Sequence, residues 1–222
     1  YVAFNEAARE NPELEDIARD WFRKLEDDDP QARDRWERIR NTSLARFNAI
    51  YDRLGVHFDK VIGESYYQQG MVDVVEQLAD SGLLEHSEGA EIVRLSDDIP
   101  PMLIRKQDGA TLYGTRDLAS AIERYQQVAF QRCLYVVDAG QGLHFRQVFG
   151  VLKMLGYDWA DDLEHAEFGV MRLNIEGNWK KGKSRAGQVI LLEEVLDQAV
   201  ALAANIVKEK NPDLPDQELD EI

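Results

Sequence analysis

The chain has 222 residues and a formal net charge of −16, because 42 Asp and Glu residues face 26 Lys and Arg residues. Its 44% hydrophobic and 31% charged residues are typical of a folded globular protein rather than a disordered or fibrous one. Such acidity argues against a domain that binds nucleic acid on its own through a basic surface. The sequence holds no apolar run of the roughly 18 residues that a membrane-spanning helix needs, which excludes a bilayer protein.

Cysteine and histidine usage gives no sign of a metal site. Cys133 is the single cysteine, which excludes a disulfide framework and a cysteine-based zinc site built within the chain. The histidines have no spacing typical of metal ligands; they are His57, His86, His144 and His165. We therefore expect no protein-bound metal and a reducing, cytoplasmic location.

Both ends of the chain suggest a piece of a longer protein. Residues 1–4 include no initiator Met and resemble no signal peptide, and the C-terminal end follows an acidic, helix-prone tail. Residues 1–33 are polar and helix-prone. Apolar residues at spacings of three, four and their multiples from Trp36 to Leu54 predict a long helix with a buried stripe, which Gly55 ends.

The middle of the chain changes character. A helix whose apolar face includes Val72 and Val75 is expected to end at Gly82. Short strands are then predicted at residues 92–95, 102–105 and 111–113, with a hairpin turn at Asp108-Gly109 between the last two.

Strands and helices alternate in the remainder. The pattern predicts helices at residues 115–127, 143–155 and 191–208, and strands at 133–138 and 166–171. The first of these strands lacks polar alternation, as expected for a strand buried on both faces. This order predicts an α/β fold with a parallel sheet and right-handed crossovers, amounting to half of a doubly wound domain.

Three places at the ends of the predicted strands could carry chemistry, since ligands of open parallel sheets bind there. Tyr113 and Asp117 are four residues apart and could face the crevice together, although Asp117 could also simply stabilise the start of a helix. Gly140 and Gly142 precede the predicted helix at 143–155, whose N-terminus favours anions, and His144 lies at the start of that helix, where it could equally be a surface or capping residue.

The third place is a basic loop at residues 171–187. It has five basic residues and one acidic residue, five minus one or +4, within a chain of −16. Such a loop is either a solvated face or a contact for a polyphosphate.

Five segments, taken in order, resemble the catalytic domain of arginyl-tRNA synthetase, a class I aminoacyl-tRNA synthetase. They are residues 63–66 (GESY), 108–119 (DGATLYGTRDLA), 135–144 (YVVDAGQGLH), 168–171 (FGVM) and 183–187 (KSRAG). The last of these is similar to a degenerate form of the class I Lys-Met-Ser-Lys-Ser loop. The resemblance covers about residues 33–214.

This resemblance implies a fold and a domain layout. The expected fold is the second half of a class I Rossmann-like nucleotide-binding domain, with a mostly helical insertion on its N-terminal side. Residues 1–33 would be a helical or linker segment and 34–105 the helical and hairpin insertion. Residues 106–210 would be the Rossmann-like half, and 211–222 the acidic start of a link to a further C-terminal domain.

The resemblance also implies roles for single residues. The residues that would bind the arginine substrate are Glu64, Tyr113 and Asp117 at its guanidinium and Gln141 at its amino-acid backbone. The residues that would bind ATP are His144, Phe168, Gly169, Met171, Lys183 and Ser184. Lys183 and Arg185 would be catalytic, by steadying the phosphates.

The resemblance implies that the chain is part of an arginine–tRNA ligase, which uses L-arginine, ATP with Mg²⁺, and tRNA(Arg). The parent enzyme is expected to be monomeric. The class I His-x-Gly-His motif is not found in the 222 residues, so this fragment alone is expected to be inactive. An alternative is a synthetase-like module that binds an amino acid or nucleotide without catalysis. A synthetase of this class for another amino acid is disfavoured by the acidic pair Glu64 and Asp117.

Overall fold

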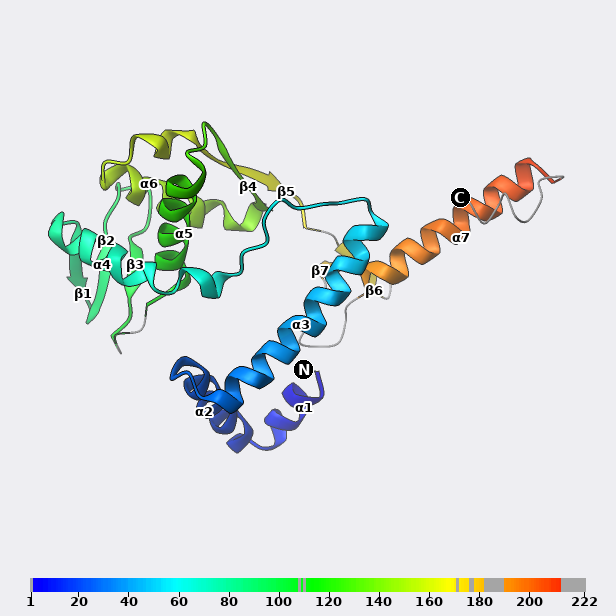
Figure 1. Ribbon diagram of the computed structural model, residues 1–222, viewed down its shortest axis with the longest axis horizontal. Coiled ribbons are helices and arrows are strands. Elements are labelled where there is room, and N and C mark those ends of the chain that lie inside the picture. The colour runs from blue at the N-terminus through cyan, green and yellow to red at the C-terminus, as the bar shows by residue number, and fades with distance from the viewer. Residues whose placement is uncertain are drawn as a thin grey trace. The chain divides into compact units, whose positions relative to one another are not determined.

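The computed structural model describes residues 2–107, 109, 111–170, 172–175, 178–181 and 190–212 (Figure 1). The chain divides into two compact units, Tyr1–Asp59 with Met171–Ile222, and Lys60–Val170. No helix among these described residues is long and apolar enough to cross a membrane.

The first unit is mainly helical. Its helices are α1 (Val2–Glu10), α2 (Glu13–Glu26), α3 (Pro30–Arg53) and α7 (Leu192–Lys210), and its strands β6 (Arg172–Ile175) and β7 (Asn178–Lys181) pair antiparallel. Helix α3 begins sharply because the Asp29 side chain accepts hydrogen bonds from the backbone N–H groups of Gln31 and Ala32, at 3.0 and 2.9 Å, while Pro30 occupies the first turn. The long helix and the helix near residues 191–208 are therefore confirmed.

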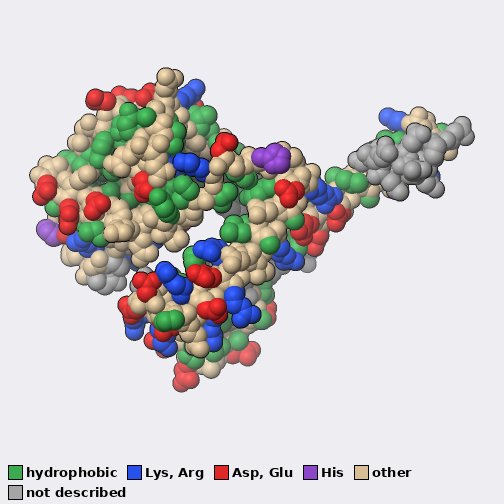
Figure 2. All heavy atoms as spheres, in the orientation of Figure 1, with side chains coloured by type: hydrophobic (Ala, Val, Ile, Leu, Met, Phe, Trp, Pro, Cys, Tyr) green, Lys and Arg blue, Asp and Glu red, His purple; other side chains and the backbone are tan. Residues whose placement is uncertain are grey.

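The prediction that the stripe of the long helix is buried is wrong. Ile39 and Phe47 on α3 are exposed. Apolar side chains are accordingly visible on the surface of the helices in Figure 2. The physical reason is that α2, the described element that packs most on α3, has 14 residues against the 24 of α3 and so covers only part of its length.

The second unit begins with a turn of 3-10 helix, η1 (Glu64–Tyr67), and with α4 (Gly70–Asp80). Three antiparallel strands follow, β1 (Leu84–Ser87), β2 (Ala90–Val93) and β3 (Met102–Arg105), in the spatial order β1-β2-β3. The strand predicted at residues 111–113 is wrong. Thr111 forms only an isolated bridge with Arg105, and Tyr113 already belongs to the next helix.

The unit continues as alternating helices and strands: α5 (Tyr113–Val128), β4 (Cys133–Asp138), α6 (Gly142–Met154) and β5 (Leu163–Phe168). Strands β4 and β5 pair in parallel, from Cys133 opposite Leu163 to Asp138 opposite Phe168. These elements confirm the mixed α/β fold with a parallel strand pair. Strand β5 begins three residues before the predicted start at residue 166.

Strand β4 is buried on one face only, contrary to the prediction. Leu134 is 51% exposed and Val136 68% exposed, whereas Tyr135 between them is buried. The Tyr135 ring packs on Phe145 and Phe149 of α6, with ring centroids 5.0 and 5.4 Å apart. The described helices thus cover the Tyr135 face, where burial raises the pKa of the Tyr135 hydroxyl to about 12.

The core of this unit lies between α4, α5, α6 and the two sheets. Its completely buried side chains include Leu78, Val93, Ile104, Leu118, Val148 and Leu152. Thr115 is also completely buried, and its hydroxyl donates to the carbonyl oxygen of Ile104 at 2.9 Å. This bond fixes the first turn of α5 to β3.

Replacing Thr115 with Val is expected to lower the free energy of unfolding by about 1–3 kcal/mol, because Val keeps the shape but removes the buried donor. Urea unfolding followed by circular dichroism measures it. The matched control is Thr42→Val, since the Thr42 hydroxyl donates to the Arg38 carbonyl at 2.8 Å on an exposed face of α3. A loss no larger than that of the control would show that the Thr115 bond does not anchor the helix.

Candidate functional site

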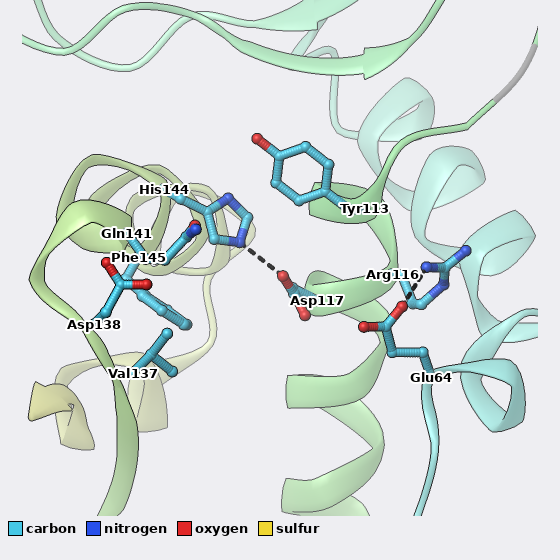
Figure 3. Close-up of a pocket in the computed structure, with 9 residues that line it drawn as sticks. All are labelled: Glu64, Tyr113, Arg116, Asp117, Val137, Asp138, Gln141, His144 and Phe145. Carbon is cyan, nitrogen blue, oxygen red and sulfur yellow. Dashed lines mark hydrogen bonds and ion pairs between the residues drawn. The ribbon is translucent and has the colours of Figure 1, made fainter. Parts of the chain in front are cut away.

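A cavity of about 530 Å³ opens at the carboxyl end of β4, beside the first turns of α5 and α6 (Figure 3). Its lining residues are Glu64, Tyr113, Arg116, Asp117, Val137, Asp138, Gln141, His144 and Phe145. They come from η1, α5, β4, the 3-10 turn η2 (Ala139–Gln141) and the start of α6. This is the end of a parallel strand at which α/β proteins bind ligands.

Helix α5 supplies three of these side chains. Leu112 is extended, with φ −113° and ψ 167°, and the helix begins at Tyr113. Arg116 and Asp117 follow at the third and fourth positions beyond Tyr113, so all three lie on one side of the helix. The Tyr113 ring lies 4.9 Å from the His144 ring, and both residues also line a second cavity of about 250 Å³.

The turn after β4 presents the opposite wall. The Asp138 side chain accepts a hydrogen bond from the backbone N–H of Gly140 at 2.9 Å and so closes the turn that precedes α6. A Cβ on Gly140 would stand 2.8 Å from Asp138 Oδ1, which explains why glycine suits this position. Gln141, the last residue of this turn, and His144, in the first turn of α6, face the cavity (Figure 3).

Two carboxylates in the cavity are each held by one neighbouring side chain. Asp117 Oδ2 lies 2.7 Å from His144 Nε2, and Glu64 Oε2 accepts a hydrogen bond from Arg116 Nη1 at 2.7 Å (Figure 3). Within the described part of the chain, the other oxygen of each carboxylate accepts no hydrogen bond from a side chain. Each carboxylate is therefore oriented and still has an oxygen for a ligand.

The cavity carries an excess of negative charge. Glu64, Asp117 and Asp138 contribute three negative charges and Arg116 one positive charge, which leaves −2 with histidine counted as neutral. Paired carboxylates beside a phenol are suited to a cation with several hydrogen-bond donors, such as a guanidinium.

The structure brings all four residues expected to bind arginine into this cavity: Glu64, Tyr113, Asp117 and Gln141. His144, expected on the ATP side, also lines it and contacts Asp117. Phe168 and Gly169 follow at the end of β5, where Phe168 pairs with Asp138, and neither lines the cavity. The remaining expected site residues lie outside the described residues; they are Met171, Lys183, Ser184 and Arg185.

The lining residues that sequence reasoning missed are Arg116, Val137, Asp138 and Phe145. A signal for Arg116 was present, because it directly precedes Asp117 and shares the helix side of Tyr113. Among the described residues, no group of three or more His, Cys, Asp or Glu side chains could hold a metal ion.

Comparison with known proteins points to one family. The family model of class I tRNA synthetases (R), catalytic domain, matches residues 1–222. An arginine–tRNA ligase of Pediococcus pentosaceus is 50% identical over 215 residues, which are 96% of this chain and 38% of that protein. A ligase of the same name from Ligilactobacillus salivarius is 50% identical over 219 residues, 98% of this chain and 38% of that protein.

Solved structures show the same fold. Arginyl-tRNA synthetase from Plasmodium falciparum superposes with a TM-score of 0.74 at 22% identity, over 90% of this chain and 33% of that one. The Thermus thermophilus enzyme gives a TM-score of 0.67 at 20% identity, over 96% of this chain and 40% of that one. The chain thus spans 38% of the length of the curated relatives named above. It belongs to the family of class I tRNA synthetases (R), within their catalytic domain.

Proposed function

We propose that the chain is a segment of an arginine–tRNA ligase, which activates L-arginine with ATP to arginyl-adenylate, releasing pyrophosphate, and then transfers arginine to tRNA(Arg). The observation that carries this proposal is the pair of oriented carboxylates, Glu64 and Asp117, in one anionic cavity. The curated relatives that bear the name arginine–tRNA ligase support it independently.

The cavity offers a chemical basis for choosing arginine. A guanidinium presents five N–H donors in a planar fork, which matches the free oxygens of Glu64 and Asp117 and the hydroxyl of Tyr113. A lysine ammonium is a single-point donor and would leave some of these acceptors unpaired, at a cost in binding. Gln141, on the opposite wall, would contact the amino-acid backbone of the substrate.

The ATP side of the proposed site rests on the sequence resemblance. His144, Phe168, Gly169 and Met171 would contact the nucleotide, which enters as its Mg²⁺ complex. Lys183 and Ser184 would contact the phosphates, and Lys183 and Arg185 would stabilise their charge. The β4–α6–β5 unit is consistent with residues 106–210 forming the Rossmann-like half of the domain.

The proposed reaction has two steps. A carboxylate oxygen of arginine attacks the α-phosphorus of ATP and pyrophosphate leaves; a 3′-terminal hydroxyl of tRNA then attacks the arginyl carbonyl and AMP leaves. Negative charge grows on the phosphate oxygens in the first step, where cations such as Lys183 and Arg185 would act. Because the chain contains no His-x-Gly-His motif, we expect catalysis only from the intact ligase, a cytoplasmic monomer.

Calorimetric titration tests the proposed substrate, with both the 222-residue chain and the intact ligase that contains it. We expect the intact ligase to bind L-arginine at least about tenfold more tightly than lysine or citrulline. Lysine lacks the planar fork of N–H donors, and citrulline lacks the positive charge. Equal binding of citrulline would contradict the assigned pocket. A synthetase-like binding module would instead bind arginine but catalyse no arginine-dependent exchange between ATP and pyrophosphate.

A further inference from the structure

Arg116 is the one cationic Lys or Arg side chain among the described residues that line the cavity. Its Nη1 donates to Glu64 Oε2 at 2.7 Å, and Figure 3 shows its guanidinium beside the Glu64 carboxylate. The Arg116 side chain is 32% exposed, whereas that of Glu64 is 81% exposed. A protein cation thus occupies one side of a carboxylate that we assign to the substrate.

The two partners are held with different firmness. Arg116 follows Thr115, which is completely buried and bonded to the Ile104 carbonyl, so its backbone belongs to a fixed turn of α5. Glu64 begins the four-residue η1 and projects a long, exposed side chain. Such a side chain has many rotamers when it has no partner. Arg116, whose backbone is fixed, therefore orients the exposed side chain of Glu64.

Stability does not explain this arrangement. Ion pairs with one partner this exposed contribute little to folding. Moreover, the buried Nε of Arg116 has no hydrogen-bond partner within the described part of the chain, which is a cost. A role in ligand binding explains this partly desolvated cation beside the cavity better than a role in folding stability does.

On the basis of the proposed function, we propose that Arg116 is a positioning residue for arginine recognition. It holds Glu64 Oε2 so that Oε1 faces the substrate guanidinium, and Glu64 bridges two guanidinium groups through its two oxygens. Loss of Arg116 would also change the charge of the same lining residues from −2 to −3, which by itself favours a cation, so weaker arginine binding in its absence would report the lost orientation of Glu64. Arg116 does not itself contact the substrate.

The test is a double-mutant cycle in the intact ligase, read as the dissociation constant for L-arginine by calorimetry. Arg116→Gln is expected to weaken arginine binding about tenfold, with the KM for ATP unchanged and kcat little altered. Arg116→Lys keeps a charge and a donor and should restore part of the affinity. In a Glu64→Gln background, Arg116→Gln should add less than about twofold, because its effect acts through Glu64.

The controls separate this inference from the function on which it rests. Arg94→Gln breaks another exposed ion pair, Arg94 Nε to Glu85 Oε2 at 3.2 Å, away from the cavity, and should leave arginine affinity unchanged. The positioning role would be overturned if the double variant lost arginine affinity by the product of the two single-variant factors. Unchanged affinity in a folded Arg116→Gln protein would overturn it as well. Unchanged affinity in Glu64→Gln would instead overturn the assigned pocket itself.

Discussion

Replacing Asp117 with Asn is expected to weaken L-arginine binding by about 100-fold, the largest effect that a single isosteric change should have on this cavity. The substitution removes the charge and turns one acceptor into an NH₂ group that faces the donors of the guanidinium. The Asn carbonyl oxygen can still accept from His144 Nε2, which contacts Asp117 Oδ2 at 2.7 Å, so the fold around the site should persist. Calorimetry on the intact ligase measures the loss.

Two comparisons make the Asp117 result specific. Citrulline carries a neutral carbonyl where arginine is charged, and its affinity should fall far less or rise in Asp117→Asn. Asp80→Asn removes an exposed carboxylate at the end of α4 and should leave arginine binding unchanged. An arginine affinity that survives in Asp117→Asn would mean that the guanidinium binds elsewhere.

The sequence predicted the alternating part of the fold best. Residues 133–138 are an uninterrupted run of mostly apolar residues, and β4 has those bounds. The sequence-based prediction failed for features that depend on tertiary contacts. Strand β1 contains Glu85 and His86 and has no β-branched residue, so its sequence carries little strand signal. Leu134 and Val136 are apolar yet exposed, because no described element covers their face of β4.

The parts of the candidate site formed by residues close in sequence could be predicted, whereas contacts between distant segments could not. Tyr113 and Asp117 are one helical turn apart, and their spacing alone places them together. The alternative that Asp117 only stabilises the start of a helix loses support, since the first turn of α5 contains no acidic residue and Asp117 contacts His144. Glu64 joins Arg116 across 52 residues of sequence, a contact that no local pattern encodes. Glu64 was assigned to the site only through the family resemblance.

The scaffold behind the site should respond to a different substitution. Leu118 follows Asp117 on α5 but is completely buried in the core, so Leu118→Ala is expected to lower the free energy of unfolding by about 3 kcal/mol. Urea unfolding of the chain measures this loss. Val128→Ala, at an exposed position of the same helix, should cost less than about 0.5 kcal/mol.

The Leu118 variant also tests how rigidly α5 presents its cavity side. Leu118 is buried in the core while Asp117 lines the cavity, so at temperatures well below unfolding the arginine affinity of the intact ligase should change by less than about threefold. A stability loss no greater than that of Val128→Ala would contradict the packing of α5 described above. A large loss of affinity in a protein that remains folded would show that core packing against α5, and not only its side chains in the cavity, sets the geometry of recognition.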